Sequence, residues 1–226
     1  MTIELFTGTP GSGKSLDAAN EIRIELKHGK PVIANFEVIT NEDWSGTFTY
    51  MPNSRVSPGN LVALARDYWS GRDFKENGIV LVLDECQLLF NSRNWNVDTD
   101  RMEWLEFFSQ HRKYGYRVIL ICQADIMIDK QFRSLVEYEC NHRKISHYGF
   151  LGLLLKYICI GEIFYSCQTL YAAKIKTGGR FFRYSKKLGA MYDSYTTFQQ
   201  TPSAAVAAPG VAESGIMASS ATSYFD

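Results

Sequence analysis

Short apolar runs alternate with amphipathic segments along this chain, and the pattern is clear from the first residues onward. Ile3–Thr7 is a run of β-forming side chains, and beyond a glycine-rich segment Leu16, Ala19, Ile22 and Leu26 recur at spacings of three, three and four. That spacing places the four side chains on one face of an α-helix. The pattern predicts a strand, a loop and a helix in immediate succession.

The alternation continues through the next hundred residues. A polar connection is expected over Glu37–Asn60. Met102, Leu105 and Phe108 form one helical stripe, which Trp104 and Phe107 widen. The predicted strands are Pro31–Phe36, Ile79–Leu83, Arg117–Cys122 and Val136–Ile145, and the predicted helices are Asn60–Trp69, Met102–Lys113 and Ile126–Leu135. Alternating strands and helices of this kind indicate an α/β fold whose sheet is mostly parallel and flanked by helices.

The loop between the first strand and the first helix carries the most specific motif of the chain. Its sequence matches the phosphate-binding pattern G-x-x-x-x-G-K-[ST] at every specified position. The predicted nucleotide-binding residues are Gly8, Thr9, Pro10, Gly11, Ser12, Gly13, Lys14 and Ser15. The glycines allow backbone N–H groups to point at phosphates, and the following helix adds its positive end. Lys14 would reach the β and γ phosphates, and the Ser15 hydroxyl would complete a Mg²⁺ shell.

Two carboxylates follow the most apolar run, Ile79–Leu83. This unbroken run is typical of a strand buried in a parallel sheet, and its carboxyl end faces the same crevice as the phosphate loop. Asp84 could hold Mg²⁺ opposite Ser15. Glu85 could accept a proton from a water in line with the γ phosphate, which favours hydrolysis over a small-molecule kinase reaction. Alternatively, Glu85 is a solvated residue at a strand end.

Three further side chains are candidates for catalysis. Gln123 closes the Arg117–Cys122 strand, and it could sense the γ phosphate if that strand lies beside the Asp84 strand; capping the strand end is the alternative. Arg112 and Arg133 follow apolar helix faces that could present them to a neighbouring subunit, where a guanidinium stabilises transition-state charge. Either arginine could instead be an ordinary surface residue.

Composition narrows the function classes. The 226 residues carry 24 basic and 24 acidic side chains, so the net charge is zero. The overall charge therefore does not indicate binding to nucleic acid or to a membrane. The five cysteines are scattered and include no C-x-x-C pair, which suits a reducing compartment. A cleaved secretion signal is not expected, because the nucleotide loop begins almost at the N-terminus.

The C-terminal third is harder to interpret. Phe150–Cys167 is apolar enough to suggest a membrane-spanning segment, but Lys156 and Glu162 interrupt it. These charges favour a helix and a strand packed on the core, or a segment that lies at the membrane interface. Lys174–Lys187 combines six basic residues with three aromatic ones and no acidic residue. Such a segment can bind nucleic acid or lipid headgroups; a solvated hairpin around Gly178 and Gly179, with its aromatic rings turned inward, is the favoured alternative.

These patterns predict three parts. Residues 1–148 form a nucleotide-binding core, residues 149–198 a β-rich extension that contains the basic and aromatic segment, and residues 199–226 a low-complexity tail without stable structure.

The order of several segments resembles the zonular occludens toxin (Zot) domain family, which includes the assembly ATPases of filamentous phages. The resemblance covers about residues 1–198, and its segments are Phe6–Ser15, Val32–Phe36, Asp84–Gln87, Ser109–Gly115 and Tyr192–Tyr195. The phosphate loop alone is unspecific, but these segments in this order are specific together.

The resemblance implies an additional-strand ATPase fold that uses ATP and Mg²⁺. It also implies a homo-oligomer that couples hydrolysis to phage assembly and extrusion, with phage assembly and secretion proteins and single-stranded phage DNA as partners. A cytoplasmic protein at the host inner membrane is expected. Because those relatives usually continue into a membrane-spanning helix and this sequence ends in a low-complexity tail, the expected membrane association is peripheral or indirect. A DNA-translocating packaging ATPase and, in another class, a secreted effector on host-cell junctions are the alternatives.

Overall fold

The computed structural model describes residues 2–41, 43–90, 98–145 and 162–192. By its internal contacts the chain divides into two units, Met1–Ser194 and Tyr195–Asp226, and all of the described residues belong to the first. The predicted tail over 199–226 and the boundary at residues 148 and 149 lie outside the described residues.

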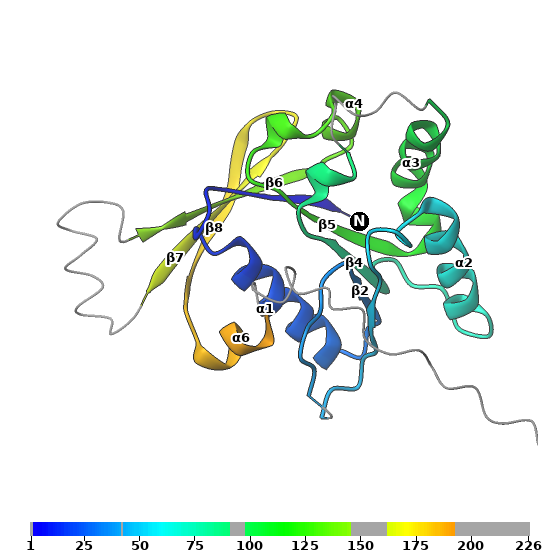
Figure 1. Cartoon of the computed structure of the whole chain (residues 1–226), viewed down its shortest axis with the longest axis horizontal. Coiled ribbons are helices and arrows are strands. Elements are labelled where there is room, and N and C mark those ends of the chain that lie inside the picture. Colours follow the sequence, from blue (N-terminus) through cyan, green and yellow to red (C-terminus); the bar gives the residue numbers. More distant parts are fainter. Residues whose placement is uncertain (1, 42, 91–97, 146–161, 193–226) are drawn as a thin grey trace, which may run out of the picture. The chain divides into compact units, whose positions relative to one another are not determined.

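One sheet runs through the described residues, with the strand order β3-β2-β4-β5-β1-β6-β7-β8 (Figure 1). The strands are β1 (Ile3–Thr7), β2 (Val32–Ala34), β3 (Phe48–Tyr50), β4 (Ile79–Leu83), β5 (Tyr116–Ile121), β6 (Tyr138–Lys144), β7 (Ile163–Leu170) and β8 (Ile175–Arg183). Pairing is parallel from β3 to β6 and antiparallel from β6 to β8. The predicted α/β fold with a β-rich C-terminal extension is confirmed.

The position of β5 gives the sheet its additional-strand character. This strand lies between β1 and β4, pairing Leu5 with Leu120 on one side and Leu83 with Leu120 on the other. The Arg117–Cys122 strand therefore lies beside the Asp84 strand, which is the arrangement that the predicted role of Gln123 requires. As a result, the carboxyl ends of β1, β5 and β4 meet at one edge of the sheet.

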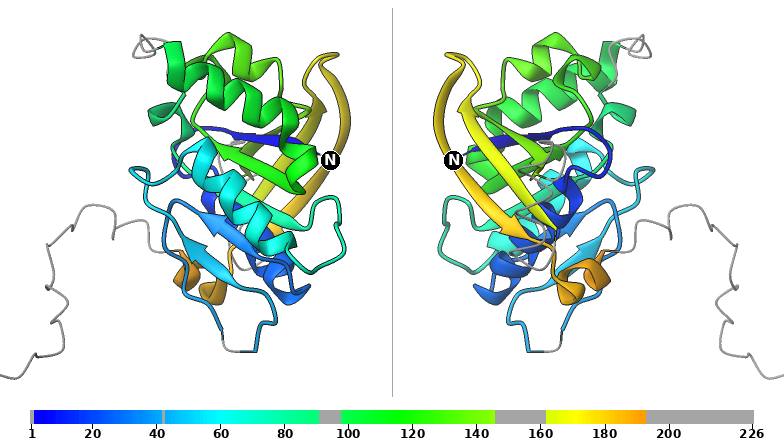
Figure 2. Two further views of the ribbon diagram at one scale, coloured as in Figure 1. Left: turned by 90° about the vertical axis from the view of Figure 1, so that its right-hand side faces the viewer. Right: turned by 90° about the vertical axis from the view of Figure 1, so that its left-hand side faces the viewer.

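Helices cover both faces of the sheet (Figures 1 and 2). On one face α2 (Pro58–Trp69) and α3 (Asp98–Gln110) pack on Leu81 and Leu83, and on the other α1 (Lys14–Lys27) and α6 (Lys186–Met191) pack on Val80 and Val82. The alternation of these four side chains between the two cores explains why β4 is apolar at every position. A short helix, α4 (Lys130–Arg133), precedes β6.

Several predicted elements need correction. The connection over Glu37–Asn60 contains β3, a three-residue strand too short to produce a visible alternation. The helix predicted over Ile126–Leu135 is broken into a 3-10 turn and α4, because Ile128 is extended and the Asp129 carboxylate accepts the Gln131 N–H at 2.8 Å, starting a new helix. The predicted 102–113 helix begins at Asp98 and ends in a 3-10 turn over His111–Tyr114.

The buried face of α3 also differs from the predicted stripe. Trp104, Phe107 and Phe108 are buried, whereas Met102 is 64% exposed. The three rings pack against one another and against Phe90 and Tyr116. Ring packing therefore decides the orientation of this helix.

The hairpin predicted around Gly178 and Gly179 exists, but its turn lies elsewhere. The chain reverses between Leu170 and Ile175, where Lys174 adopts a φ of +54°, and both glycines lie within β8. Gly179 sits against the Tyr165 ring, so a side chain there would collide with it. The aromatic residues do not all turn inward, since Phe181 is 69% exposed.

The apolar segment Phe150–Cys167 is only partly described. Its residues 163–167 belong to β7, where Phe164 and Ser166 are buried, and residues 150–161 lie outside the described residues. Among the described helices, none has the length and apolar character that crossing a bilayer requires.

Candidate nucleotide-binding site

The phosphate loop joins β1 to α1 at the edge where the parallel strands end. Gly8, Gly11 and Gly13 have φ angles of +143°, +74° and +96°, and Gly13 directly precedes the helix. A Cβ on Gly8 would lie 2.5 Å from the His142 carbonyl oxygen, and one on Gly13 would lie 2.7 Å from the Phe164 ring. The loop can therefore be built only with glycine at these two positions.

The polar groups of the loop fit a phosphate. The Lys14 ammonium donates to the carbonyl oxygens of Gly8 and Thr9 at 2.7 and 3.2 Å, so it is folded back over the loop. The Ser12 hydroxyl is buried and has no hydrogen-bond partner among the described residues. Burial lowers the pKa of Lys14, although the charges of Asp84 and Glu85 partly oppose this. A desolvated ammonium and an unpaired hydroxyl beside a helix N-terminus are groups that an anion would satisfy.

Asp84 follows β4 and faces the start of α1. Its Oδ2 lies 3.4 Å from the Ser15 hydroxyl, which donates to it. Burial raises the pKa of Asp84, and hydrogen bonds from Tyr192 and from the Glu85 N–H only partly offset this. Serine and aspartate oxygens are hard ligands, so these two side chains fit a Mg²⁺ ion bound together with a nucleotide.

Two partners of Asp84 were not predicted as site residues. The Tyr192 hydroxyl, just past α6, donates to the Asp84 Oδ2 at 2.8 Å. At the end of β2 the Asn35 side chain accepts the Asp84 N–H at 2.7 Å and donates to its carbonyl oxygen at 2.8 Å. Asn35 could have been found from the sequence, because it lies at the end of a predicted strand and such strand ends line the site. Nothing in the sequence near Tyr192 connects it with Asp84.

Glu85 has an uncommon backbone conformation. Its φ is +47°, in the left-handed region, and its side chain is exposed. The Gln87 amide donates to its carboxylate, and the Glu85 N–H donates to the Asp84 Oδ1 at 2.7 Å. Non-glycine residues in this region carry a backbone cost of about 1–3 kcal/mol and cluster at functional sites. Asp84 and Glu85 thus place two successive carboxylates directly after β4, at the edge of the sheet where the phosphate loop lies.

Gln123 and the two arginines occupy different places. Gln123 follows β5 between the loop and Asp84: its carbonyl oxygen accepts the Gly8 N–H at 3.2 Å, and its side chain is exposed. Arg112 is exposed in the turn before β5, at the opposite edge of the sheet. Arg133 in α4 lies near Tyr171, beside the start of β6 and away from the loop. The structure therefore brings Gln123 to the site and leaves both arginines away from it.

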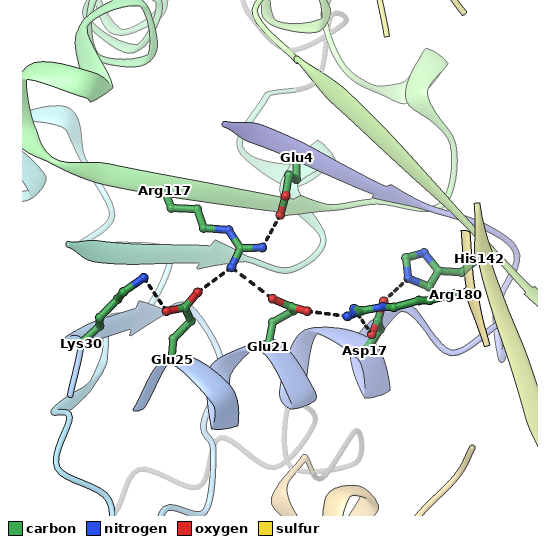
Figure 3. A network of polar contacts seen from close by, with 8 residues as sticks. All are labelled: Glu4, Asp17, Glu21, Glu25, Lys30, Arg117, His142 and Arg180. Carbon is green, nitrogen blue, oxygen red and sulfur yellow. Dashed lines mark hydrogen bonds and ion pairs between the residues drawn. The ribbon is translucent and has the colours of Figure 1, made fainter. Parts of the chain in front are cut away.

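Behind the loop, charged side chains hold α1 against the sheet (Figure 3). The Asp17 carboxylate is almost fully buried, 1% exposed, and contacts His142 Nε2 at 2.8 Å and the Arg180 guanidinium of β8. Burial alone would raise the pKa of Asp17, but these two partners outweigh it and hold the pKa below its usual value. Arg180 also pairs with Glu21 at 2.8 Å. One turn of α1 is thus tied to β6 and β8.

The second half of this network is centred on Arg117 of β5. Its guanidinium pairs with Glu4 and Glu25 at 2.7 Å and with Glu21 at 3.1 Å, and Lys30 also pairs with Glu25 at 2.7 Å. Burial raises the pKa of Glu4 in spite of Arg117, whereas Lys30 and Arg117 together hold the pKa of Glu25 below its usual value. The network fixes α1, and with it Lys14 and Ser15, relative to the strands.

Replacing Arg117 by methionine is expected to lower the free energy of unfolding by about 3–5 kcal/mol at pH 7, because buried carboxylates lose their cation. The loss should be smaller at pH 5, because Arg117 lowers the pKa values of Glu4 and Glu25 and both values rise in the folded protein without it. The folded variant then binds more protons than the unfolded chain, so its stability increases as the pH falls. Urea unfolding measures both values. Arg66→Met, at an exposed arginine of α2, is the matched control; an equal loss in the control, or a loss that does not change with pH, would contradict this role.

Comparison with known proteins identifies the family. The family model for zonular occludens toxin (Zot) matches residues 2–199. The chain belongs to the Zot family. It is 32% identical to the gene 1 protein of Enterobacteria phage M13 over 167 residues, which are 70% of this chain and 47% of the M13 protein. The chain thus spans about half the length of this curated relative.

Two solved structures share the fold. The N-terminal domain of the Zot protein from Neisseria meningitidis aligns with a TM-score of 0.55 at 17% identity, over 85% of this chain and 98% of that one. The genome packaging NTPase B204 of Sulfolobus turreted icosahedral virus 2, in complex with ATP-gammaS, aligns with a TM-score of 0.50 at 13% identity, over 80% of this chain and 96% of that one. The fold of this Zot family member is that of a P-loop NTPase.

Proposed function

We propose that the chain is an ATPase that uses Mg²⁺-dependent hydrolysis to drive the assembly and extrusion of filamentous phage at the host inner membrane. The observation that carries the hydrolytic part is the meeting of Lys14 and Ser15 with Asp84 and Glu85 at one edge of the sheet. The phage role is supported by membership of the Zot family and by the M13 gene 1 protein as a relative.

Each side chain has a separate task in this proposal. Lys14 leaves the carbonyl oxygens of its own loop and binds the β and γ phosphate oxygens, while the loop N–H groups and the start of α1 bind the remaining phosphate charge. Ser15 and Asp84 hold Mg²⁺, which neutralises charge on the phosphates. Glu85 accepts the proton of the attacking water, and Gln123, beside the loop, responds to the γ phosphate.

The proposal includes a homo-oligomer. Arg112 is exposed at the edge opposite the phosphate loop, so its guanidinium could reach a γ phosphate only in another copy. Such an arginine stabilises the charge of the transition state. Arg133 is kept as the second candidate for the same role. The proposed partners of this homo-oligomer are phage assembly and secretion proteins, single-stranded phage DNA and the inner membrane.

Phosphate release measured with Mg²⁺ and with EDTA, over a range of protein concentrations, tests this function. We expect turnover only with Mg²⁺, and a specific activity that rises with protein concentration as copies associate. Light scattering on the same samples reports the oligomeric state. Full turnover in EDTA would contradict the metal role, and constant specific activity from a persistent monomer would contradict the action of arginine between copies.

A further inference from the structure

A groove of about 880 Å³ lies on the α1 side of the sheet. One wall is α1, the other is the end of β8 with α6, and the segment after β2 lies at one end. Figures 1 and 2 show α6 beside α1, and the two helices are in contact. No phosphate-loop residue lines the groove in the described part of the chain. The groove is therefore separate from the nucleotide site.

Four cations line the groove from two sides. Arg23 and Lys27 stand one turn apart on α1, while Arg183 and Lys187 come from β8 and α6. None of the described lining residues is acidic. Because the whole chain has a net charge of zero, this positive potential is local and composition does not reveal it. The Arg23 Nε is also buried without a partner within the described residues.

Aromatic and apolar side chains line the groove together with these cations. The rings are Trp44 and Phe182, both half-buried, and Ile39 beside them is 68% exposed. Phe182 stacks on Phe164 at 5.5 Å between ring centroids, which fixes the orientation of its ring. Rings held between cations can stack with bases whose phosphates pair with the surrounding positive charges.

We propose that this groove binds a single-stranded nucleic acid. Arg23, Lys27, Arg183 and Lys187 pair with successive phosphates, and Trp44 and Phe182 contact the bases. A duplex would keep its bases stacked inside and away from the rings. A bilayer surface is flat, whereas these rings line a concave site together with four cations. This inference rests on the proposed function in one respect, since single-stranded phage DNA is one of its proposed partners; the binding itself does not require ATP hydrolysis.

Fluorescence anisotropy of a labelled oligothymidylate tests the proposal with the full-length chain, without nucleotide and in EDTA. We expect the wild type to bind at low salt, and each double variant, Arg23→Gln with Lys27→Gln or Arg183→Gln with Lys187→Gln, to bind about tenfold more weakly or worse. The logarithm of the association constant falls linearly with the logarithm of the salt concentration. Loss of two phosphate contacts should make this slope shallower by about 1.4, since each contact to a single strand contributes about 0.7.

Trp44→Leu supplies an independent readout. Loss of one stacked base should weaken binding about 5- to 160-fold and leave the salt slope unchanged, because stacking releases no counterions. The matched control is Arg66→Gln with Lys75→Gln, which removes two exposed cations on the α2 side of the chain. Its affinity and slope should stay at the wild-type values, and retained binding of a fluorescent ATP analogue shows that each variant is folded.

Several results would overturn the proposal. They are no binding of the oligothymidylate by the wild type at low salt, equal weakening by the control, equal competition by polyglutamate, and equal affinity for the matching duplex. Stronger binding to vesicles of anionic lipid, lost in the same variants, would assign the groove to lipid headgroups instead. Lys14→Ala should still bind the oligothymidylate, so failure of the ATPase proposal and failure of this one are distinguishable.

Discussion

Lys14→Ala is expected to remove ATP turnover, by a factor of about 100 to 1,000 or to below detection. The ammonium now lies 2.7 Å from the Gly8 carbonyl oxygen, in a loop with no other cationic side chain. Its removal leaves the β and γ phosphates without a cationic side chain from the loop. Phosphate release measures turnover, and the fluorescence of a labelled ATP analogue measures binding, which should weaken in parallel.

The matched control for this change is Lys75→Ala, at an exposed lysine between α2 and β4. It removes the same charge at a distance from the loop and should keep wild-type turnover. Circular dichroism should show that both variants are folded, since Lys14 bonds only to the loop in the described structure. Turnover at the wild-type rate by Lys14→Ala would show that the phosphate loop is not the catalytic site.

Glu85→Gln should separate nucleotide binding from hydrolysis. The amide has nearly the size of the carboxylate but cannot take a proton from water, so turnover should fall by about 100- to 10,000-fold, the range of general base catalysis. Affinity for the ATP analogue should change little, because neither Lys14 nor Ser15 is altered. Quenched-flow measurement of a single turnover distinguishes slow chemistry from slow product release.

Glu76→Gln is the matched control for this carboxylate, since Glu76 is exposed before β4, at the other end of the same strand. It should turn over ATP as the wild type does. A Glu85→Gln chain with wild-type turnover would leave Glu85 as a strand-end residue held by Gln87. In that case the base would have to be sought elsewhere at the edge formed by β1, β5 and β4.

The sequence predicts those parts of the site that depend on neighbours in the chain. The phosphate loop is encoded by eight consecutive residues, and the strand before Asp84 is recognisable from its unbroken apolar run. The additional-strand fold followed only from the resemblance, and the order of the strands came from the structure, since the local pattern contains no pairing information. The prediction of a turn at Gly178 and Gly179 was wrong because both residues lie within β8, where Gly179 is packed closely against the Tyr165 ring.

Contacts between distant segments could not be predicted. Tyr192 reaches Asp84 across 108 residues, and Arg117 reaches Glu25 across 92. In the sequence Asp17, Glu21 and Glu25 resemble the solvated face of a helix, although the structure buries them against two arginines. A charged stripe of this kind is explained only once the strands that supply its partners are placed.

The pairing of Arg180 with Asp17 and Glu21 has a consequence for engineering chimaeras of this protein. The β7–β8 hairpin supplies a guanidinium to the first turns of the helix that follows the phosphate loop, so it is not an exchangeable module. A fragment that ends before β7 would leave Asp17 with His142 alone, in a buried position two residues past Ser15. A β7–β8 hairpin taken from a relative will therefore have to be transferred together with the α1 of that relative.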